Sequence, residues 1–126
     1  MNKVGHFEIP ADDVERAKKF YKIFGWHIED VPQMDYVVLR TVAVDENRKP
    51  KEVGAINGGM MKRTKEVKHP VIVIEVKSVD QSIQQVVAAG GKQISDKMEI
   101  GGMGYYAYVS DTEGNVLGLW ETITKK

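Results

Sequence analysis

The chain repeats one local pattern at a fixed spacing, and this repeat limits the folds that it can adopt. In Asp12-Asp13-Val14-Glu15 and again in Ser78-Val79-Asp80-Gln81, a short polar residue stands three positions before Glu or Gln. This is the pattern of a capping box, which satisfies the unpaired amides at the start of a helix. Gly25 and Gly91 are suited to end the two helices, because glycine readily takes the left-handed conformation found there. Starts and ends are both 66 residues apart (78 − 12 and 91 − 25), so the repeat predicts an internal duplication.

Apolar periodicity predicts the same series of elements in each copy. The predicted helix of the first copy covers 13–24, and its strands cover 4–9, 26–31, 36–44 and 53–60. The predicted helix of the second copy begins at Ser78, and its strands cover 71–76, 92–100, 105–109 and 115–121. Each copy is then a strand, a helix and a meander of three strands, which is a compact α+β module.

The length of the chain, 126 residues, is that of one domain. We expect a single domain over 1–126, with internal modules of about 1–62 and 69–126 joined by a charged linker. No signal peptide precedes His6, and no apolar run reaches the length of a membrane span. The sequence therefore predicts a cytoplasmic protein with no membrane partner.

Composition argues against several kinds of function. Eighteen Lys and Arg balance eighteen Asp and Glu, so the chain lacks the clustered positive charge that is typical of nucleic-acid binding. The absence of cysteine excludes disulfides, thiolate nucleophiles and Cys-ligated metals. No serine stands in the context of a nucleophile elbow.

Four segments carry a resemblance to the vicinal oxygen chelate superfamily, which holds glyoxalase I, extradiol dioxygenases, and fosfomycin-resistance and bleomycin-resistance proteins. They are Val4-Gly5-His6-Phe7-Glu8-Ile9, residues 13–25 with the pair Phe20-Tyr21, Ala88-Ala89-Gly90-Gly91, and residues 111–121. The resemblance implies a fold class of two tandem βαβββ modules that form a curved mixed sheet around a cleft. It also implies a homodimer. It does not settle the activity, because one fold hosts many functions.

Metal-dependent members of the superfamily take about one ligand from each of the first, fourth, fifth and eighth strands, typically His or Glu. In this chain these positions fall on His6, on Asn57, on Val71 (or Ile72 if the register slips by one residue) and on Gly118. His6 alone is a strong ligand, because Asn57 brings no charge and the other two bring no donor. Glu121 lies three residues beyond Gly118 and therefore on the opposite face of its strand. The resemblance, tested in this way, predicts no bound metal and no cofactor.

A different metal site stays open as an alternative. His6 and Glu8 are two residues apart on one predicted strand, so they share a face. His69 joins them only if the register slips by two residues and a bulge turns its side chain inward. Pro70 favours a loop or the entry of a strand at this point instead.

Five residues are predicted to contact a ligand: His6, Glu8, Asn57, Tyr108 and Trp120. His6 is the best candidate base, since imidazole titrates near neutrality. Glu8 can accept a hydrogen bond from His6 or from a ligand. Trp120 shares its face with Gly118 and offers a flat surface for stacking. Tyr108 shares a face with Tyr106, but the sequence does not say which face.

Three functions are consistent with these residues. The first is a glyoxalase/bleomycin-resistance-like protein that binds a small organic molecule in a metal-free cleft. The second is a lyase, isomerase or dioxygenase-like enzyme that uses His6 as a base or as part of a partial divalent-metal site. The third is an interaction protein in which the cleft is vestigial.

Overall fold

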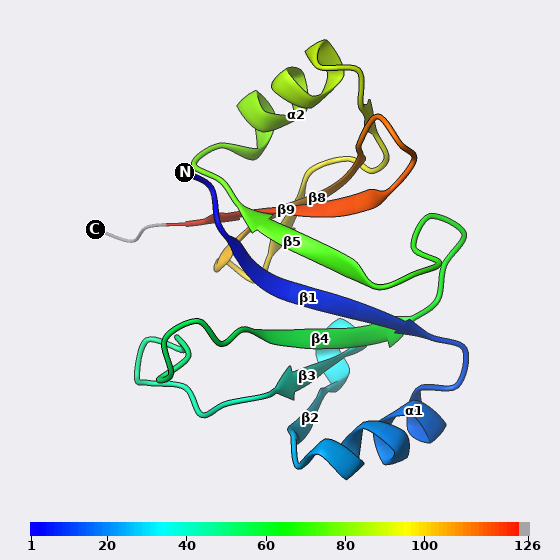
Figure 1. Cartoon of the computed structure of the whole chain (residues 1–126), viewed down its shortest axis with the longest axis vertical. Helices are drawn as coiled ribbons and strands as arrows, with labels where there is room; N and C mark the ends of the chain where they lie inside the picture. Colours follow the sequence, from blue (N-terminus) through cyan, green and yellow to red (C-terminus); the bar gives the residue numbers. More distant parts are fainter. Residues whose placement is uncertain (124–126) are drawn as a thin grey trace. The chain divides into compact units, whose positions relative to one another are not determined.

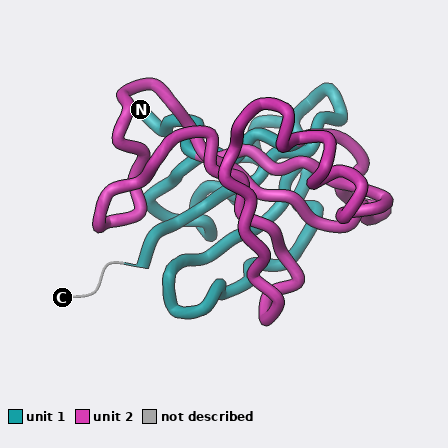
Figure 2. The backbone as a smooth tube through the Cα atoms, turned by 90° about the horizontal axis from the view of Figure 1, so that it is seen from below, with its two compact units in different colours: residues 1–5, 71–126 teal, residues 6–70 magenta. Residues whose placement is uncertain are grey.

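The computed structural model describes residues 1–123, which contain nine strands and two α-helices and form a mixed α+β fold. They divide into two compact units (Figure 2). Unit 2 comprises residues 6–70, and unit 1 comprises residues 1–5 together with residues 71 onward. No helix of the described part is both long enough and apolar enough to cross a membrane.

Unit 2 is a four-stranded sheet with a helix on one face. Its sheet has the strand order β2-β3-β4-β1, in which only the pair of β4 and β1 is parallel (Figure 1). The elements are β1 (Val4–Ala11, of which residues 6–11 belong to this unit), α1 (Val14–Tyr21), β2 (His27–Val31), β3 (Tyr36–Arg40) and β4 (Asn57–Lys62), with 3-10 helices at Lys22–Phe24 and Pro32–Met34.

The two faces of this sheet differ in chemistry because side chains alternate along each strand. Leu39 and Met60 are fully buried in the core, to which α1 contributes Val14, Ala17 and Tyr21. The other face carries the residues that alternate with these. The ladder of β1 and β4 pairs His6 with Asn57 and Glu8 with Gly59, so these four residues share the face away from α1.

Unit 1 has the same general plan, with α2 on one face of the strands β5, β9, β8 and β6. The pair of β5 and β9 is parallel, and the other pairs are antiparallel. Val79 of α2 is buried against Ala107, Val109 and Leu119. The elements are β5 (Val71–Glu75), α2 (Val79–Ala88), β6 (Lys92–Gln93), β7 (Met98–Ile100), β8 (Gly104–Ser110) and β9 (Val116–Thr122).

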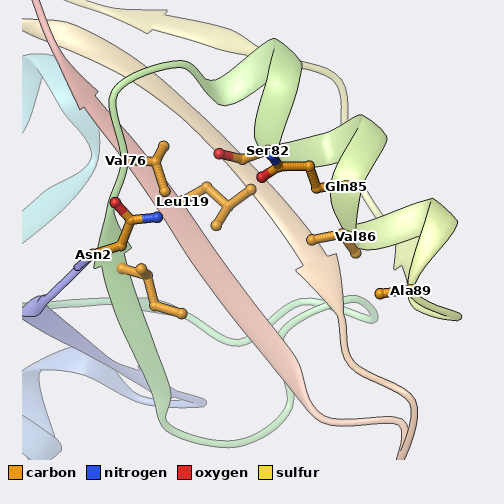
Figure 3. A pocket seen from close by; sticks show the side chains of 8 residues that line it. Asn2, Val76, Ser82, Gln85, Val86, Ala89 and Leu119 are labelled. Atoms are coloured by element: carbon orange, nitrogen blue, oxygen red, sulfur yellow. The ribbon is translucent and has the colours of Figure 1, made fainter.

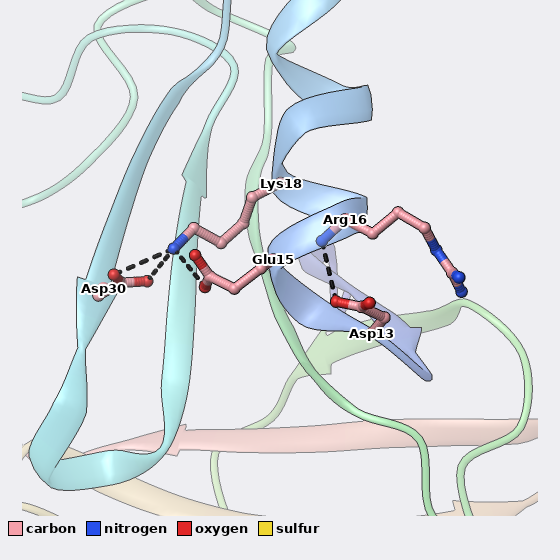
Figure 4. Close-up of polar contacts among 5 residues, drawn as sticks. All are labelled: Asp13, Glu15, Arg16, Lys18 and Asp30. Carbon is pink, nitrogen blue, oxygen red and sulfur yellow. Dashed lines mark hydrogen bonds and ion pairs between the residues drawn. The ribbon is translucent and has the colours of Figure 1, made fainter.

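The helix starts confirm one predicted cap and correct the other. Ser78 caps α2 by accepting a hydrogen bond from the Gln81 amide at 3.1 Å, as expected. At α1 the cap is Asp13, whose carboxylate accepts from the Arg16 amide at 3.0 Å (Figure 4). The prediction of Asp12 was wrong by one residue, and Asp12 instead forms an ion pair with Arg63.

The helix ends need a similar correction. Gly25 is left-handed with φ of 77°, as predicted, but α1 itself ends at Tyr21 and a 3-10 helix covers the last turn. After the end of α2 the glycine with positive φ is Gly90, at 100°, in place of Gly91. The offset between the capping residues is then 78 − 13 = 65, and between the glycines it is 90 − 25 = 65. This offset aligns His6 with Val71.

Two predicted strand boundaries were wrong in the middle of unit 2. The strand predicted over 36–44 stops at Arg40, because the Asn57 side-chain oxygen accepts from the Thr41 and Val42 amides at 2.7 and 3.1 Å. These amides are therefore unavailable for a strand partner. The strand predicted over 53–60 begins only at Asn57 and continues to Lys62.

The strand predicted over 92–100 is interrupted, and its two ends form β6 and β7 on the same neighbour, β8. The Ile94 and Ser95 amides both donate to the Tyr108 carbonyl, at 2.9 and 3.1 Å. The Ser95 hydroxyl accepts from the Tyr108 amide at 2.9 Å. One serine side chain thus takes the place of a backbone carbonyl and interrupts the strand.

Lys18 connects α1 to β2 through an ion pair with Asp30. Its ammonium group donates to Glu15 at 2.8 Å and to both carboxylate oxygens of Asp30 at 2.9 and 3.1 Å (Figure 4). The hydrogen bond to Glu15, followed by that to Asp30, raises the pKa of Lys18 above its ordinary value.

The assignment of the first cap can be tested by comparing two neighbouring aspartates. We expect Asp13→Ala to lower the free energy of unfolding by about 1 kcal/mol, because the Arg16 amide loses its acceptor. Asp12→Ala removes only the ion pair of an exposed carboxylate with Arg63, and we expect a loss of about 0.5 kcal/mol or less. Urea denaturation of both variants measures the difference, and equal losses contradict the assignment.

Candidate functional site

A short chain of hydrogen bonds crosses the face of unit 2 that lies away from α1. The Tyr36 hydroxyl, from β3, donates to Glu8 Oε2 at 3.0 Å and lies 3.0 Å from His6 Nε2. Because the hydroxyl proton is given to Glu8, the proton of the second bond comes from His6 Nε2. The lone pair of the neutral imidazole is then on Nδ1. Tyr36 therefore connects the two β1 residues that the sequence placed on one face.

Glu8 is the buried member of this group. It is 4% exposed, whereas His6 and Tyr36 are half-buried. Burying a carboxylate is costly unless hydrogen-bond donors replace the water that it loses. The hydroxyl of Tyr36 is one such donor. The half-buried His6 and Tyr36 rings are the parts of the group that keep some exposure to solvent.

Gly59 makes room for this arrangement. It pairs with Glu8 on β4, and a Cβ atom at residue 59 would overlap the hydroxyl and ring of Tyr36. Any side chain at this position therefore requires Tyr36 to move. The close approach of Tyr36 to the strand backbone explains why a glycine occurs in the middle of a strand.

Asn57 lies beside His6 in the ladder but takes a structural role in the loop that follows β3. Its side-chain oxygen accepts from the amides of Thr41 and Val42, which fixes the orientation of the carboxamide. Its Nδ2 atom is buried without a hydrogen-bond partner in the described part of the chain. A ligand that contacts Asn57 as predicted therefore has to reach this Nδ2 donor, which is shielded from solvent.

The remaining predicted ligand residues, Tyr108 and Trp120, lie in unit 1 on the face away from α2. Tyr106 contacts both rings, with centroid distances of 5.0 Å to Tyr108 and 6.3 Å to Trp120. The Tyr106 hydroxyl lies over Gly118, where a Cβ atom would overlap it. The face shared by Tyr106 and Tyr108, which the sequence left open, is therefore the face of Gly118 and Trp120.

Glu121 lies on the opposite face from Gly118, as strand alternation predicted. Its carboxylate accepts from the Val79 amide at 2.8 Å and so adds a second acceptor at the start of α2. Glu121 thus helps to cap α2 in unit 1, and its side chain lies on the other face of β9 from Trp120.

The residues of the described part do not fit a divalent metal ion. Within residues 1–123, no three His, Cys, Asp or Glu side chains are close enough to hold one. The side chain that stands beside both His6 and Glu8 is Tyr36, whose hydroxyl brings no charge. His69 is exposed in the loop before β5 and does not join His6 and Glu8.

Tyr36 is the residue of this site that the sequence analysis missed. It stands 28 residues after Glu8, and only the pairing of β3 with β4 brings it over Gly59. The one signal in the sequence is the pair Gly58-Gly59 inside the predicted strand 53–60. Such glycines often mark a close approach of another group to the backbone.

Comparison of the sequence with known proteins finds a bleomycin-resistance-like family profile and glyoxylase-like relatives. A family profile described as Bleomycin resistance protein-like N-terminal matches residues 3–41. A glyoxylase-like domain-containing protein of Didymella fabae is 30% identical over 122 residues, covering 90% of this chain and 88% of the relative. A Mycobacterium tuberculosis protein, CFP32, is named provisionally as a glyoxylase and is 24% identical over 115 residues. The chain spans 43% of the length of CFP32.

Solved structures share the fold. A variant of methylmalonyl-CoA epimerase from Streptomyces coelicolor, in complex with 2-nitronate-propionyl-CoA, matches with a TM-score of 0.65. The match covers 98% of this chain and 99% of the epimerase, at 16% sequence identity. At this identity the likeness shows the fold alone.

The contact between Tyr36 and Gly59 can be tested by a double-mutant cycle. We expect Gly59→Ala to lower the free energy of unfolding by about 1–3 kcal/mol, because the new methyl group displaces the Tyr36 ring. In a Tyr36→Leu background, the same substitution is expected to cost less, because the overlapping ring atoms are gone. Urea denaturation of the four proteins gives the coupling energy. An equal cost of Gly59→Ala in both backgrounds contradicts the contact.

Proposed function

Because the chain belongs to the glyoxylase-like proteins of the vicinal oxygen chelate superfamily, we propose that it binds a small organic molecule without a metal ion. The binding groups in unit 2 are His6 and Tyr36, held in place by Glu8. Tyr108 and Trp120 remain predicted ligand contacts of unit 1, where their rings flank Tyr106.

The observation that supports binding without a metal is the position of the Tyr36 hydroxyl. It takes the space over Gly59 and is hydrogen-bonded to Glu8. The hydroxyl is neutral and stands beside His6 and Glu8, so it adds no charge that would help these two side chains hold a divalent cation. Hydroxyl and imidazole groups instead suit hydrogen bonds to a carbonyl or hydroxyl of an organic ligand.

The proposal predicts where a ligand binds and what weakens it. In an NMR screen with small carbonyl compounds, we expect binders to shift the ring signals of His6 and Tyr36, with or without EDTA. We expect Tyr36→Phe to weaken such binding about tenfold, the effect of one lost hydrogen bond. Tyr105→Phe is the matched control, because Tyr105 packs on the α2 face of unit 1.

Titration with metal ions tests whether binding is independent of a metal. Calorimetric titration with Ni²⁺, Zn²⁺, Mn²⁺ and Fe²⁺ is expected to show no stoichiometric binding. Tight binding of one ion per chain that His6→Ala abolishes would overturn the metal-free proposal. Equal losses of ligand affinity in Tyr36→Phe and Tyr105→Phe would remove Tyr36 from the binding site.

The second candidate function is an enzyme of the lyase, isomerase or dioxygenase-like kind in which His6 is the base. The hydrogen-bond chain favours it, because Tyr36 holds His6 Nε2 and connects it to the Glu8 carboxylate. When the imidazole takes a proton from carbon, the new imidazolium charge is stabilised through Tyr36 by this carboxylate. A carbon acid next to a carbonyl group suits such a base.

Proton exchange tests this candidate directly. We expect methylmalonyl-CoA in D₂O with EDTA to exchange its α-hydrogen in the presence of the protein, as measured by mass spectrometry. His6→Ala is expected to lower the exchange rate by about 10²–10⁴-fold, which is the usual contribution of a general base. Exchange that His6→Ala leaves unchanged would exclude His6 as the base, and no exchange above the rate without protein would exclude this substrate.

We also propose that the two units are tandem modules of a duplicated βαβββ unit. The offset of 65 residues between caps and between helix ends supports this, and each unit has a tyrosine hydroxyl over a glycine of the neighbouring strand. The homodimer and the cytoplasmic location stay predictions from the family resemblance and the sequence.

A further inference from the structure

A pocket of about 260 Å³ lies between α2 and the strands of unit 1, on the face away from Trp120 (Figure 3). We propose that it binds a small uncharged molecule with one polar end, separately from the function proposed for His6. The pocket is lined by Asn2, Ile74, Val76, Ser82, Gln85, Val86, Ala89 and Leu119.

The floor of the pocket is aliphatic. Ile74 and Val76 come from β5, Leu119 from β9 and Val86 from α2, and all four pack against the core of this unit. The pocket is open on one side, so an aromatic ring that lies on this floor covers it with one face and leaves its other face toward solvent. Burial of such a ring on this floor is favourable because it removes apolar surface from water.

The rim supplies hydrogen-bonding groups that the protein itself does not use. The side chains of Asn2, Ser82 and Gln85 line the pocket and make no hydrogen bond to any residue of 1–123. Figure 3 shows Ser82 and Gln85 extending from α2 toward Val76 and Leu119. An apolar floor with a few polar groups at its edge is typical of small-molecule sites.

The lining contains no charged residue, and this favours an uncharged ligand. No Lys, Arg, Asp or Glu lines the pocket, so an ionised ligand loses hydration there without gaining an ion pair. Amide and hydroxyl side chains are both donors and acceptors, and they match a carboxamide or an alcohol. The expected ligand is therefore an aromatic or short aliphatic group that bears one amide or hydroxyl.

Two small residues leave space along this edge. Ser82 belongs to α2 and Ala89 is the residue that follows its last turn, and both line the pocket together with Gln85 and Val86. Asn2, Gln85 and Ala89 are exposed, so the pocket opens to solvent and a ligand can enter without unfolding of the helix.

Benzamide is the probe that tests the proposal. In methyl-detected NMR of the full chain, we expect saturable shifts confined to the methyl groups of Ile74, Val76, Val86 and Leu119. Benzoate, which has the same ring but a charge, is expected to bind about tenfold more weakly. Shifts spread over the whole chain, no saturation, or equal affinity for benzoate would overturn the proposal.

Two tryptophan variants test the location. Ala89→Trp fills the pocket and is expected to weaken benzamide binding about tenfold or more. Ala88→Trp changes the neighbouring exposed alanine, which does not line the pocket, and is expected to leave the affinity unchanged. If Ala89→Trp fails to fold, Gln85→Leu replaces it and is expected to weaken benzamide but not toluene. Equal effects of the 89 and 88 variants, or no effect of Gln85→Leu, would place the binding elsewhere.

Discussion

The arrangement of unit 2 depends on one buried carboxylate. Glu8 is 4% exposed, and water that once hydrated it must be replaced by donors of the protein. The Tyr36 hydroxyl is such a donor, and it reaches Glu8 only because residue 59 is a glycine. The same hydroxyl also holds one nitrogen of His6. A single buried charge thus connects β1, β3 and β4 and sets the orientation of the imidazole.

Part of this site could be predicted from sequence because it needs only strand alternation. His6 and Glu8 share a face on any regular strand, and the separation of Glu121 from Trp120 follows from the same rule. Tyr36 could not be predicted, since its place over Gly59 depends on the register between two strands joined by a long loop.

The fold could be predicted as an order of elements but not to the residue. Asp12 and Asp13 are equally good caps as residue types, and only the extended backbone of Asp13 decides between them. Gly90 and Gly91 present the same ambiguity at the end of α2. The early end of β3 depends on a side chain, Asn57, that is distant in sequence from the amides it binds. Local patterns do not contain such contacts.

The contact of Tyr36 with Gly59 also constrains how this protein can evolve. If an acidic residue is introduced at position 59 first, its side chain overlaps the Tyr36 ring. If the tyrosine is replaced first, the buried Glu8 loses a hydrogen-bond donor. Either order passes through a destabilised intermediate. The two positions are therefore epistatic, and a lineage that has acquired this pair is held away from a carboxylate-rich site until stability elsewhere offsets the intermediate.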